Sequence, residues 1–293
     1  MTDPTADPTA DPTDTGIADD LGGPSQAPAD SPAEHGDREV PLAEVLPGAE
    51  PLSIAGGPVG ALVIHGFTGN PQSMRGLAEA FGGAGFTVEM PRLPGHGTSL
   101  DDMLTTSWDD WSACADEAYR DLASRCEKVV VAGLSMGGSL SLWLATEHPE
   151  VAGLVLINAA CPPPGAMDIE IEGLRALVDA GVLLVDSIGG DIADPDGHEM
   201  AYGQTPVAGL LSLMRAGTEL GGRIGTIECP VLVMNSPEDH VVSPTHSDHI
   251  AATVGGEVER LTLERSYHVA TLDYDKGLIE ERAVEFARRV TSD

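Results

Sequence analysis

The chain has 293 residues, of which 42% are hydrophobic, and this length allows one large domain or two small ones with a sizeable core. Its 47 acidic and 15 basic side chains give a formal charge of −32 at pH 7, which disfavours binding to the phosphates of nucleic acids and anionic lipids. No apolar run reaches the roughly 18 to 20 residues of a membrane span, and nothing near the first residue resembles a secretory signal, so we expect a cytoplasmic protein without stable membrane insertion.

The first 40 residues differ in composition from the rest of the chain. Residues 3–14 repeat a four-residue unit that begins with Asp-Pro-Thr. Up to Asp37 the segment holds nine acids, six prolines and no Lys or Arg, too little apolar surface to offset the entropy lost on ordering. The sequence therefore predicts a disordered acidic tail over residues 1–40 and a folded domain over residues 41–293.

From Pro58 onward, short apolar runs alternate with longer amphipathic ones, which is typical of βαβ units around a parallel sheet. The predicted strands are Val59–Ile64, Phe86–Met90, Lys128–Ala132, Val151–Ile157, Val231–Asn235 and Val258–Leu263. The predicted helices are Pro71–Phe81, Trp108–Arg125, Met136–Glu147, Ser243–Val254 and Gly277–Val290. We therefore expect an α/β fold with a mostly parallel central sheet and helices on both faces.

The alternation is interrupted between residues 158 and 228, where no clear strand is evident. Two amphipathic runs, Ile169–Leu183 and Thr205–Leu220, predict helices with more apolar surface than a solvent-facing excursion needs. We expect an insertion over one edge of the sheet, with bounds near residues 161–225. Its apolar side chains either pack as ordinary core or line a pocket for an acyl chain.

A G-x-S-x-G motif, Gly133-Leu134-Ser135-Met136-Gly137, joins an apolar strand to a helix. Glycines flank the serine because a sharp strand-to-helix turn leaves no room for side chains nearby. Such a turn exposes the serine hydroxyl beside the positive N-terminus of the helix. The motif by itself is weak evidence in a chain rich in serine and glycine, but its place between strand and helix predicts Ser135 as a nucleophile.

A serine hydroxyl is a weak nucleophile unless a histidine, itself oriented by a carboxylate, takes its proton. His268 and Asp239 each follow a predicted strand, so both are expected at the same sheet edge as Ser135. Glu238 is the alternative acid, although two adjacent side chains cannot point the same way. Three other histidines in this region are interpreted as surface residues: His240, His246 and His249. We expect no metal site, because the ligand types between residues 239 and 249 lack a second cluster at suitable spacing. Acyl-enzyme chemistry by these side chains needs no cofactor.

Acyl transfer also needs two backbone N–H groups that stabilise the oxyanion formed in the reaction. The residue after the nucleophile, Met136, is expected to supply one of them. The other is expected from the loop His65-Gly66-Phe67-Thr68-Gly69-Asn70, which directly follows the first predicted strand. We predict Phe67 as the donor; the alternative is an ordinary glycine-rich turn.

Five motifs in this order, HGFTG, PGHG, GLSMG, EDHVV and SYHVATLD, resemble bacterial carboxylesterases and monoacylglycerol lipases of the α/β-hydrolase superfamily. The resemblance runs from about Leu52 to the end of the chain. It implies an α/β-hydrolase fold with a small helical cap inserted after the sixth strand. It also implies the roles predicted above: Ser135 as nucleophile, Asp239 as acid and His268 as base. It further implies Phe67 and Met136 as oxyanion donors and His96 as a structural histidine of its loop.

The activity implied by the resemblance is hydrolysis of a small-molecule carboxylic ester through an acyl-enzyme, without a cofactor. The expected substrates are acyl monoesters of short to medium chain, monoacylglycerols among them, with Leu210 and Met214 as candidate substrate contacts. Two alternatives stay open. The same residues serve thioester hydrolysis or acyl transfer, and a hydrolase fold also serves as a ligand-sensing receptor.

Overall fold

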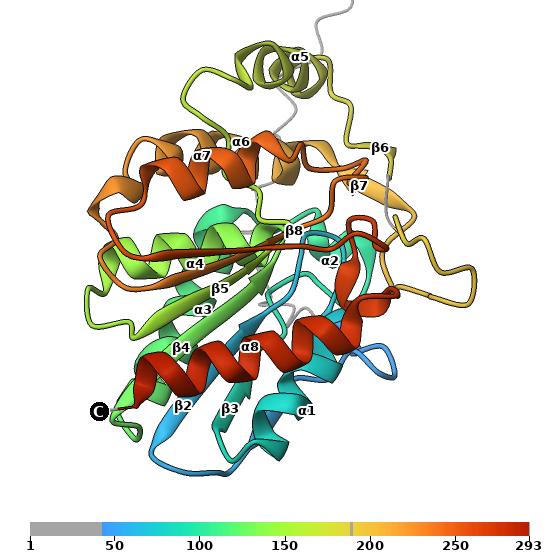
Figure 1. Cartoon of the computed structure of the whole chain (residues 1–293). Coiled ribbons are helices and arrows are strands. Elements are labelled where there is room, and N and C mark those ends of the chain that lie inside the picture. Colours follow the sequence, from blue (N-terminus) through green and yellow to red (C-terminus); the bar gives the residue numbers. More distant parts are fainter. Residues whose placement is uncertain (1–42, 188–189, 293) are drawn as a thin grey trace, which may run out of the picture. The chain divides into compact units, whose positions relative to one another are not determined.

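The computed structural model describes residues 43–187 and 190–292, so the predicted tail lies outside the described residues. A seven-stranded sheet crosses the middle of the molecule in the order β1-β3-β2-β4-β5-β8-β9 (Figure 1). Its strands are β1 (Leu52–Ile54), β2 (Val59–Ile64), β3 (Thr87–Met90), β4 (Lys128–Leu134), β5 (Gly153–Ile157), β8 (Val231–Asn235) and β9 (Val258–Thr262). Only β1 is antiparallel to its neighbour. The mostly parallel sheet confirms the predicted fold class.

Helices cover both faces of the sheet. They are α1 (Arg75–Gly83), α2 (Leu100–Met103), α3 (Trp108–Ala123), α4 (Met136–Glu147), α5 (Asp168–Asp179), α6 (Val207–Gly221), α7 (Thr245–Thr253) and α8 (Lys276–Thr291), with short 3₁₀ turns η1 (Pro71–Met74), η2 (Ile224–Thr226) and η3 (Ala270–Leu272). Among the described helices none is long and apolar enough to cross a membrane.

The core consists of two clusters, one on each face of the sheet. Successive side chains of a strand point to opposite faces, so Leu62 and Ile64 enter one cluster while Ala61 and Val63 enter the other. The first cluster packs against α3, α4, α6 and α7, and the second against α1 and α8. Because the central strands are buried on both sides, they read as continuous apolar runs in the sequence.

All six predicted strands and all five predicted helices are present, with bounds shifted by a few residues. The edge strand β1 was not predicted. Its three residues are too few to show the alternation of polar and apolar side chains that marks a strand. Its extended conformation is stabilised by antiparallel pairing with β3.

The insertion, defined here as the chain between β5 and β8, lies over the sheet edge where the parallel strands end (Figure 1). Both predicted helices are present there, as α5 and α6. The expectation of no strand was wrong, because β6 (Leu184–Asp186) and β7 (Gln204–Pro206) form a small antiparallel pair. Three-residue strands give no readable alternation. The insertion also leaves the sheet after the fifth strand of the described chain, not the sixth, because a single strand precedes β2 there.

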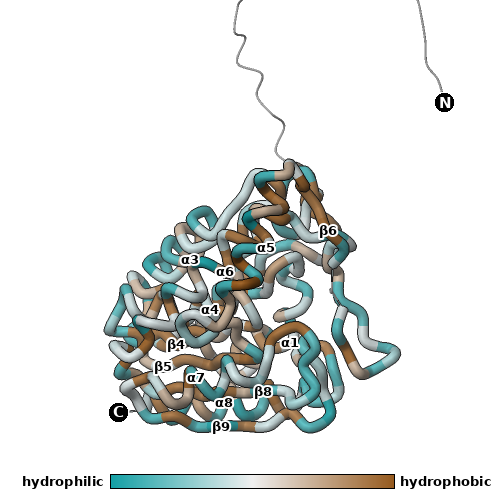
Figure 2. Tube along the Cα trace, turned by 90° about the horizontal axis from the view of Figure 1, so that it is seen from above, coloured by the Kyte–Doolittle hydropathy of each residue, from teal (hydrophilic) through white to brown (hydrophobic). Residues whose placement is uncertain are grey.

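The insertion carries apolar residues toward the rest of the domain. Figure 2 shows hydrophobic segments along α6 as well as along the central strands. On α6, Leu211, Leu213 and Leu220 are buried, whereas α5 contributes no fully buried residue. The helix α6 therefore packs as part of the core, and α5 covers it from outside.

Candidate active site

Ser135 lies at the sharp turn between β4 and α4, with φ 55° and ψ −117°. A positive φ is unfavourable for a residue with a side chain, so this turn is held by its surroundings. A Cβ at Gly133 would lie 2.1 Å from the carbonyl oxygen of Gly137, and one at Gly137 would lie 2.1 Å from that of Ile64. Both glycines of the motif are therefore required by close backbone approach, as the sequence predicts.

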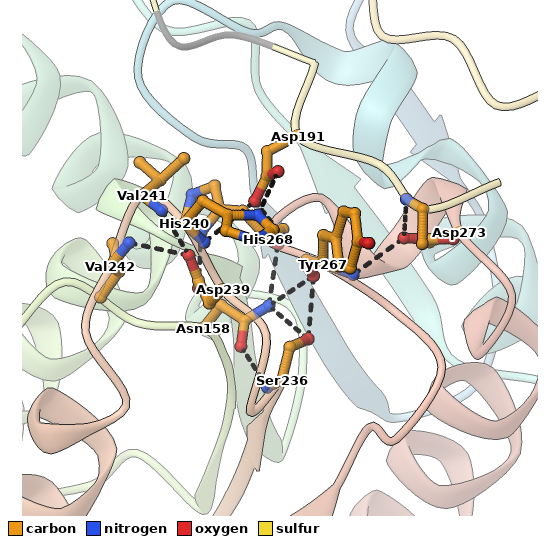
Figure 3. Close-up of polar contacts among 11 residues, drawn as sticks. Asn158, Asp191, Ser236, Asp239, His240, Val241, Val242, Tyr267, His268 and Asp273 are labelled. Carbon is orange, nitrogen blue, oxygen red and sulfur yellow. Dashed lines mark hydrogen bonds and ion pairs between the residues drawn. The ribbon is translucent and has the colours of Figure 1, made fainter. Parts of the chain in front are cut away.

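His268 and Asp239 meet at the end of the neighbouring strands β8 and β9. The Nδ1 atom of His268 lies 2.8 Å from Oδ2 of Asp239 (Figure 3). The other carboxylate oxygen, Oδ1, accepts hydrogen bonds of 2.8 Å from the backbone amides of Val241 and Val242. The Asp239 side chain is 2% exposed, so its charge is held in a protected site with both oxygens bonded.

The alternative acid does not make this contact. Glu238 is exposed, while its neighbour Asp239 points toward His268. The structure thus selects Asp239 as the partner of the imidazole. Since Nδ1 faces the carboxylate, it carries the ring proton, and Nε2 of the neutral ring keeps a lone pair for accepting another.

Ser135 and His268 line one pocket of about 230 Å³ below the insertion. Phe67, predicted as an oxyanion donor, and the predicted substrate contacts Leu210 and Met214 line the same pocket. Its other apolar residues include Leu134, Pro162, Met167, Leu213, Val241, Val242 and Val269. The insertion therefore both packs on the core and lines this pocket.

The loop after β2 runs beside the serine. A Cβ at Gly66 would lie 3.4 Å from the Cβ of Ser135. Phe67, the next residue, therefore follows directly after the point where this loop passes close to the turn at Ser135. The amide of Met136, the first residue of α4, has no acceptor within its own helix, because the first N–H groups of a helix lie beyond its hydrogen-bond ladder. The ring of Phe67 packs on Trp111 with the ring centroids 5.4 Å apart.

Two buried histidines support this loop. His65 accepts a hydrogen bond from the backbone amide of Leu93 at Nε2, so its Nδ1 carries the proton and donates to the carbonyl of Gly66. Burial and the neighbouring His96 hold the pKa of His65 well below its usual value. His96 is fully buried among the rings of His65, Phe67 and Trp111.

The surface interpretation was wrong for His246. This residue is 8% exposed and lines the pocket, and its Nδ1 atom is buried without a hydrogen-bond partner among the described residues. His249 is half-buried, with Nε2 2.9 Å from the carbonyl oxygen of Gly221. His240 is exposed, as expected. Residue type and position on α7 do not reveal this burial, because the pocket that His246 lines is assembled only in the tertiary structure, from segments far apart in the chain.

Sequence reasoning also missed Asn158 and Glu199. Asn158, at the end of β5, donates from Nδ2 to the carbonyl oxygen of His268 at 2.8 Å and accepts from the amide of Ser236. Glu199, in the insertion, lines the pocket, and burial raises the pKa of its carboxyl group. A positive φ at Asn158 is a typical signal of special geometry, but it is visible only in the structure.

The buried histidines predict a loss of stability in acid. Burial lowers the pKa of His96 and of His246 to about 4, whereas the unfolded side chain has a pKa of about 6.5. Each of them stays neutral in the folded protein while its unfolded form takes up a proton. The contribution of each neutral histidine to the free energy of unfolding is therefore complete above pH 6.5 and is lost as pH falls toward 4.

We expect the free energy of unfolding to fall by up to about 3 kcal/mol for each of these two histidines between pH 7 and pH 4. Urea denaturation at several pH values measures this loss. His246→Gln should show a flatter pH dependence over the same range, because one proton fewer is taken up on unfolding. An unchanged slope in that variant would contradict the assignment.

A family model described as "Alpha/beta hydrolase family" matches residues 61–281. The chain belongs to this family. It is 48% identical over 246 residues to the thermostable monoacylglycerol lipase of Bacillus sp. (strain H-257), an alignment that covers 83% of this chain and 95% of the relative. It is 28% identical to the carboxylesterase of Bacillus subtilis (strain 168), covering 82% and 97% of the two chains.

Solved structures give the same picture of this α/β-hydrolase. One from work on LipS and LipT, two metagenome-derived lipolytic enzymes, has a TM-score of 0.79 at 44% identity and covers 84% of this chain and 100% of its own. The monoacylglycerol lipase of Paleococcus ferrophilus has a TM-score of 0.69 at 18% identity, covering 82% and 98%. The second likeness concerns the fold alone.

Proposed function

We propose that this α/β-hydrolase is a serine hydrolase of carboxylic esters, with Ser135 as nucleophile, His268 as base and Asp239 as the acid that orients the base. The observation that carries the proposal is the His268–Asp239 hydrogen bond in the wall of the pocket that also contains Ser135 at its strained turn. The two named Bacillus relatives, a lipase and a carboxylesterase, support the same reaction class.

The proposed reaction proceeds through an acyl-enzyme. His268 removes the proton of the Ser135 hydroxyl at Nε2, and Oγ attacks the carbonyl carbon of the ester. The protonated imidazole then gives its proton to the departing alkoxide, so an alcohol leaves. A water molecule, deprotonated by the same histidine, then attacks the acyl carbon. The bond from this carbon to Oγ of Ser135 breaks, Oγ takes the proton back from His268, and the carboxylic acid is released.

Two backbone amides, those of Phe67 and Met136, are the proposed donors to the oxyanion. The close approach of Gly66 to Ser135 supports the first, and the position of Met136 at the start of α4 supports the second. The helix N-terminus adds a favourable electrostatic field at the same point. Donors held by backbone geometry need no rearrangement when charge develops, which favours the transition state over the bound ester.

The lining of the pocket supports a monoester with an apolar acyl group. The pocket is lined by Leu210, Leu213 and Met214, which offer a surface for an alkyl chain, and it also contains the polar residues Glu199 and Thr68. An acyl group esterified to a small polyol matches a lining that is mostly apolar with a few polar groups. We therefore propose monoacylglycerols of short to medium chain as substrates, in agreement with the name of the Bacillus sp. relative.

The proposal is tested with a series of p-nitrophenyl esters and with mono-, di- and triacylglycerols of the same acyl chain. Hydrolysis of the monoacylglycerol well above that of the other two is expected. Hydrolysis of the p-nitrophenyl esters without a preference for the monoacylglycerol would be consistent with an ester hydrolase but would refute monoacylglycerols as its substrates. Absence of hydrolysis with every ester, together with no labelling by a fluorophosphonate, would refute the serine hydrolase itself.

The pocket also predicts a change in acyl-chain preference. Met214→Trp replaces a flexible side chain of the lining with a larger rigid one, so kcat/KM for medium-chain monoacylglycerols should fall about tenfold relative to short-chain ones. Arg215→Trp is the matched control, because Arg215 is exposed and does not line this pocket. An equal change for all chain lengths in the Met214 variant would show that this side chain does not contact the acyl group.

A further inference from the structure

The loop that carries His268 has no regular secondary structure of its own, yet its backbone is bonded on both sides. On the sheet side, Asn158 donates from Nδ2 to the carbonyl oxygens of Tyr267 and His268, at 3.2 and 2.8 Å, and the hydroxyl of Ser236 also donates to that of Tyr267, at 2.8 Å. These contacts hold the carbonyl groups of the loop to the ends of β5 and β8 (Figure 3).

The amide groups of the same loop point toward the insertion. The amide of His268 donates to Oδ2 of Asp191 at 3.1 Å, and the amide of Val269 donates to the backbone carbonyl of Asp191 at 3.0 Å. The amide of Tyr267 donates to Oδ2 of Asp273, whose two carboxylate oxygens also accept from the amides of Ala193 and Asp194. The insertion segment around Asp191 is thus joined directly to two consecutive amides of the loop and, through the carboxylate of Asp273, to a third.

Asp191 also contacts the segment that carries the acid. Its Oδ2 accepts from the amide of His240 at 3.1 Å, and its Oδ1 lies 2.8 Å from Nδ1 of the same histidine. His240 directly follows Asp239. The hydrogen bond to the carboxylate of Asp191 raises the pKa of His240 above its usual value. The ring of His240 also packs edge-on against Tyr267, with centroids 4.7 Å apart.

We propose that Asp191 is a positioning residue for the catalytic pair: its carboxylate joins the amide of His268 to the amide next to Asp239 and thereby sets the distance between the imidazole and its acid. This role rests on the proposed function of His268. Asp191 is not among the residues that line the pocket, and its side chain is only 12% exposed. It acts through the backbone of the two loops, and the insertion therefore supports the base as well as lining the pocket.

Asp191→Ala removes both acceptor oxygens. We expect kcat for ester hydrolysis to fall about 10- to 100-fold, because small displacements of a catalytic group cost rates of this size. KM should stay unchanged, since the pocket lining is intact. Asp191→Asn keeps an oxygen that can accept from both amides and should recover kcat to within about threefold of the wild type.

Asp194→Ala is the matched control. Asp194 belongs to the same segment, but its carboxylate accepts only from the amide of Asp196 and does not reach the His268 loop in the described structure. Wild-type kcat is expected there. Wild-type kcat in Asp191→Ala would overturn the proposal, and so would an equal loss in the Ala and Asn variants, which would assign the effect to charge and not to the bonded geometry.

If circular dichroism shows that Asp191→Ala does not fold, Asp191→Glu is measured in its place. It keeps the charge and both oxygens but moves them by one methylene, so kcat should fall about tenfold at unchanged KM. Wild-type kcat in this variant would overturn the proposal equally.

A second measurement separates this proposal from that of the ester hydrolase. The Nδ1 proton of His268, shared with Asp239, is expected as a low-field proton resonance in the wild type and in Asp194→Ala, and as a shifted or broadened one in Asp191→Ala. This readout needs no substrate. Failure of the wild type to hydrolyse esters would refute the proposed function, whereas an unchanged resonance in Asp191→Ala would refute the positioning role.

Discussion

Ser135→Ala should lower kcat for ester hydrolysis by at least about 10⁴-fold, because the residues of a nucleophile, base and acid set act as a unit. The loss of the hydroxyl removes the atom that would form the acyl-enzyme. KM should change little, since the pocket of about 230 Å³ keeps its apolar lining. Steady-state hydrolysis of a p-nitrophenyl ester measures both constants.

The loss of labelling is a second readout for this variant. The wild type should gain the mass of one phosphonyl group on reaction with a fluorophosphonate, and Ser135→Ala should gain none. Ser141→Ala is the control, because Ser141 lies on α4 with its hydroxyl bonded to the carbonyl of Gly137 and away from the pocket lining. Hydrolysis or labelling at the wild-type level in Ser135→Ala would place the nucleophile elsewhere.

Asp239→Asn is expected to lower kcat about 10⁴-fold with little effect on folding, since an amide has the same shape as the carboxylate. The amide oxygen can still accept from Val241 and Val242. Its NH₂ group then faces Nδ1 of His268, so the ring is driven into the tautomer that carries its proton on Nε2. An imidazole in that form cannot take a proton from Ser135.

Glu238→Gln is the matched control for the acid. The two residues are adjacent and both lose one charge, but Glu238 is exposed and only Asp239 contacts the imidazole. The control should retain wild-type kcat. The reverse result, with Glu238→Gln inactive and Asp239→Asn active, would show that the alternative acid orients the base.

The turn at Ser135 was predictable because its requirements are local. An apolar strand, two glycines that permit close backbone approach and a following helix are contiguous in the sequence, and the structure reproduces each of them. The strands β2, β4, β5 and β8 were predictable for a related reason. They are buried on both faces, so they read as unbroken apolar runs.

The contact between His268 and one of the two candidate acids depended on more distant parts of the chain. Asp239 and Glu238 are equivalent in chemistry and neighbours in the sequence, and only the fold of the loop after β8 decides which one meets His268. The burial of His246 is a similar case, because it depends on which distant segments line the pocket together with this side chain. Neither property leaves a periodic pattern along the chain.

By itself, the amino-acid sequence determined the α/β alternation, the position of the sharp turn at Ser135 and the candidates for nucleophile, acid and base, since propensity, hydrophobic period and turn chemistry act over a few residues. The tertiary structure alone decided that Asn158 and Asp191 hold the loop of His268. Their bonds to that residue span 110 and 77 positions of the chain. Such contacts form only when packing brings two loops together, so they are properties of the folded sheet edge and not of any local segment.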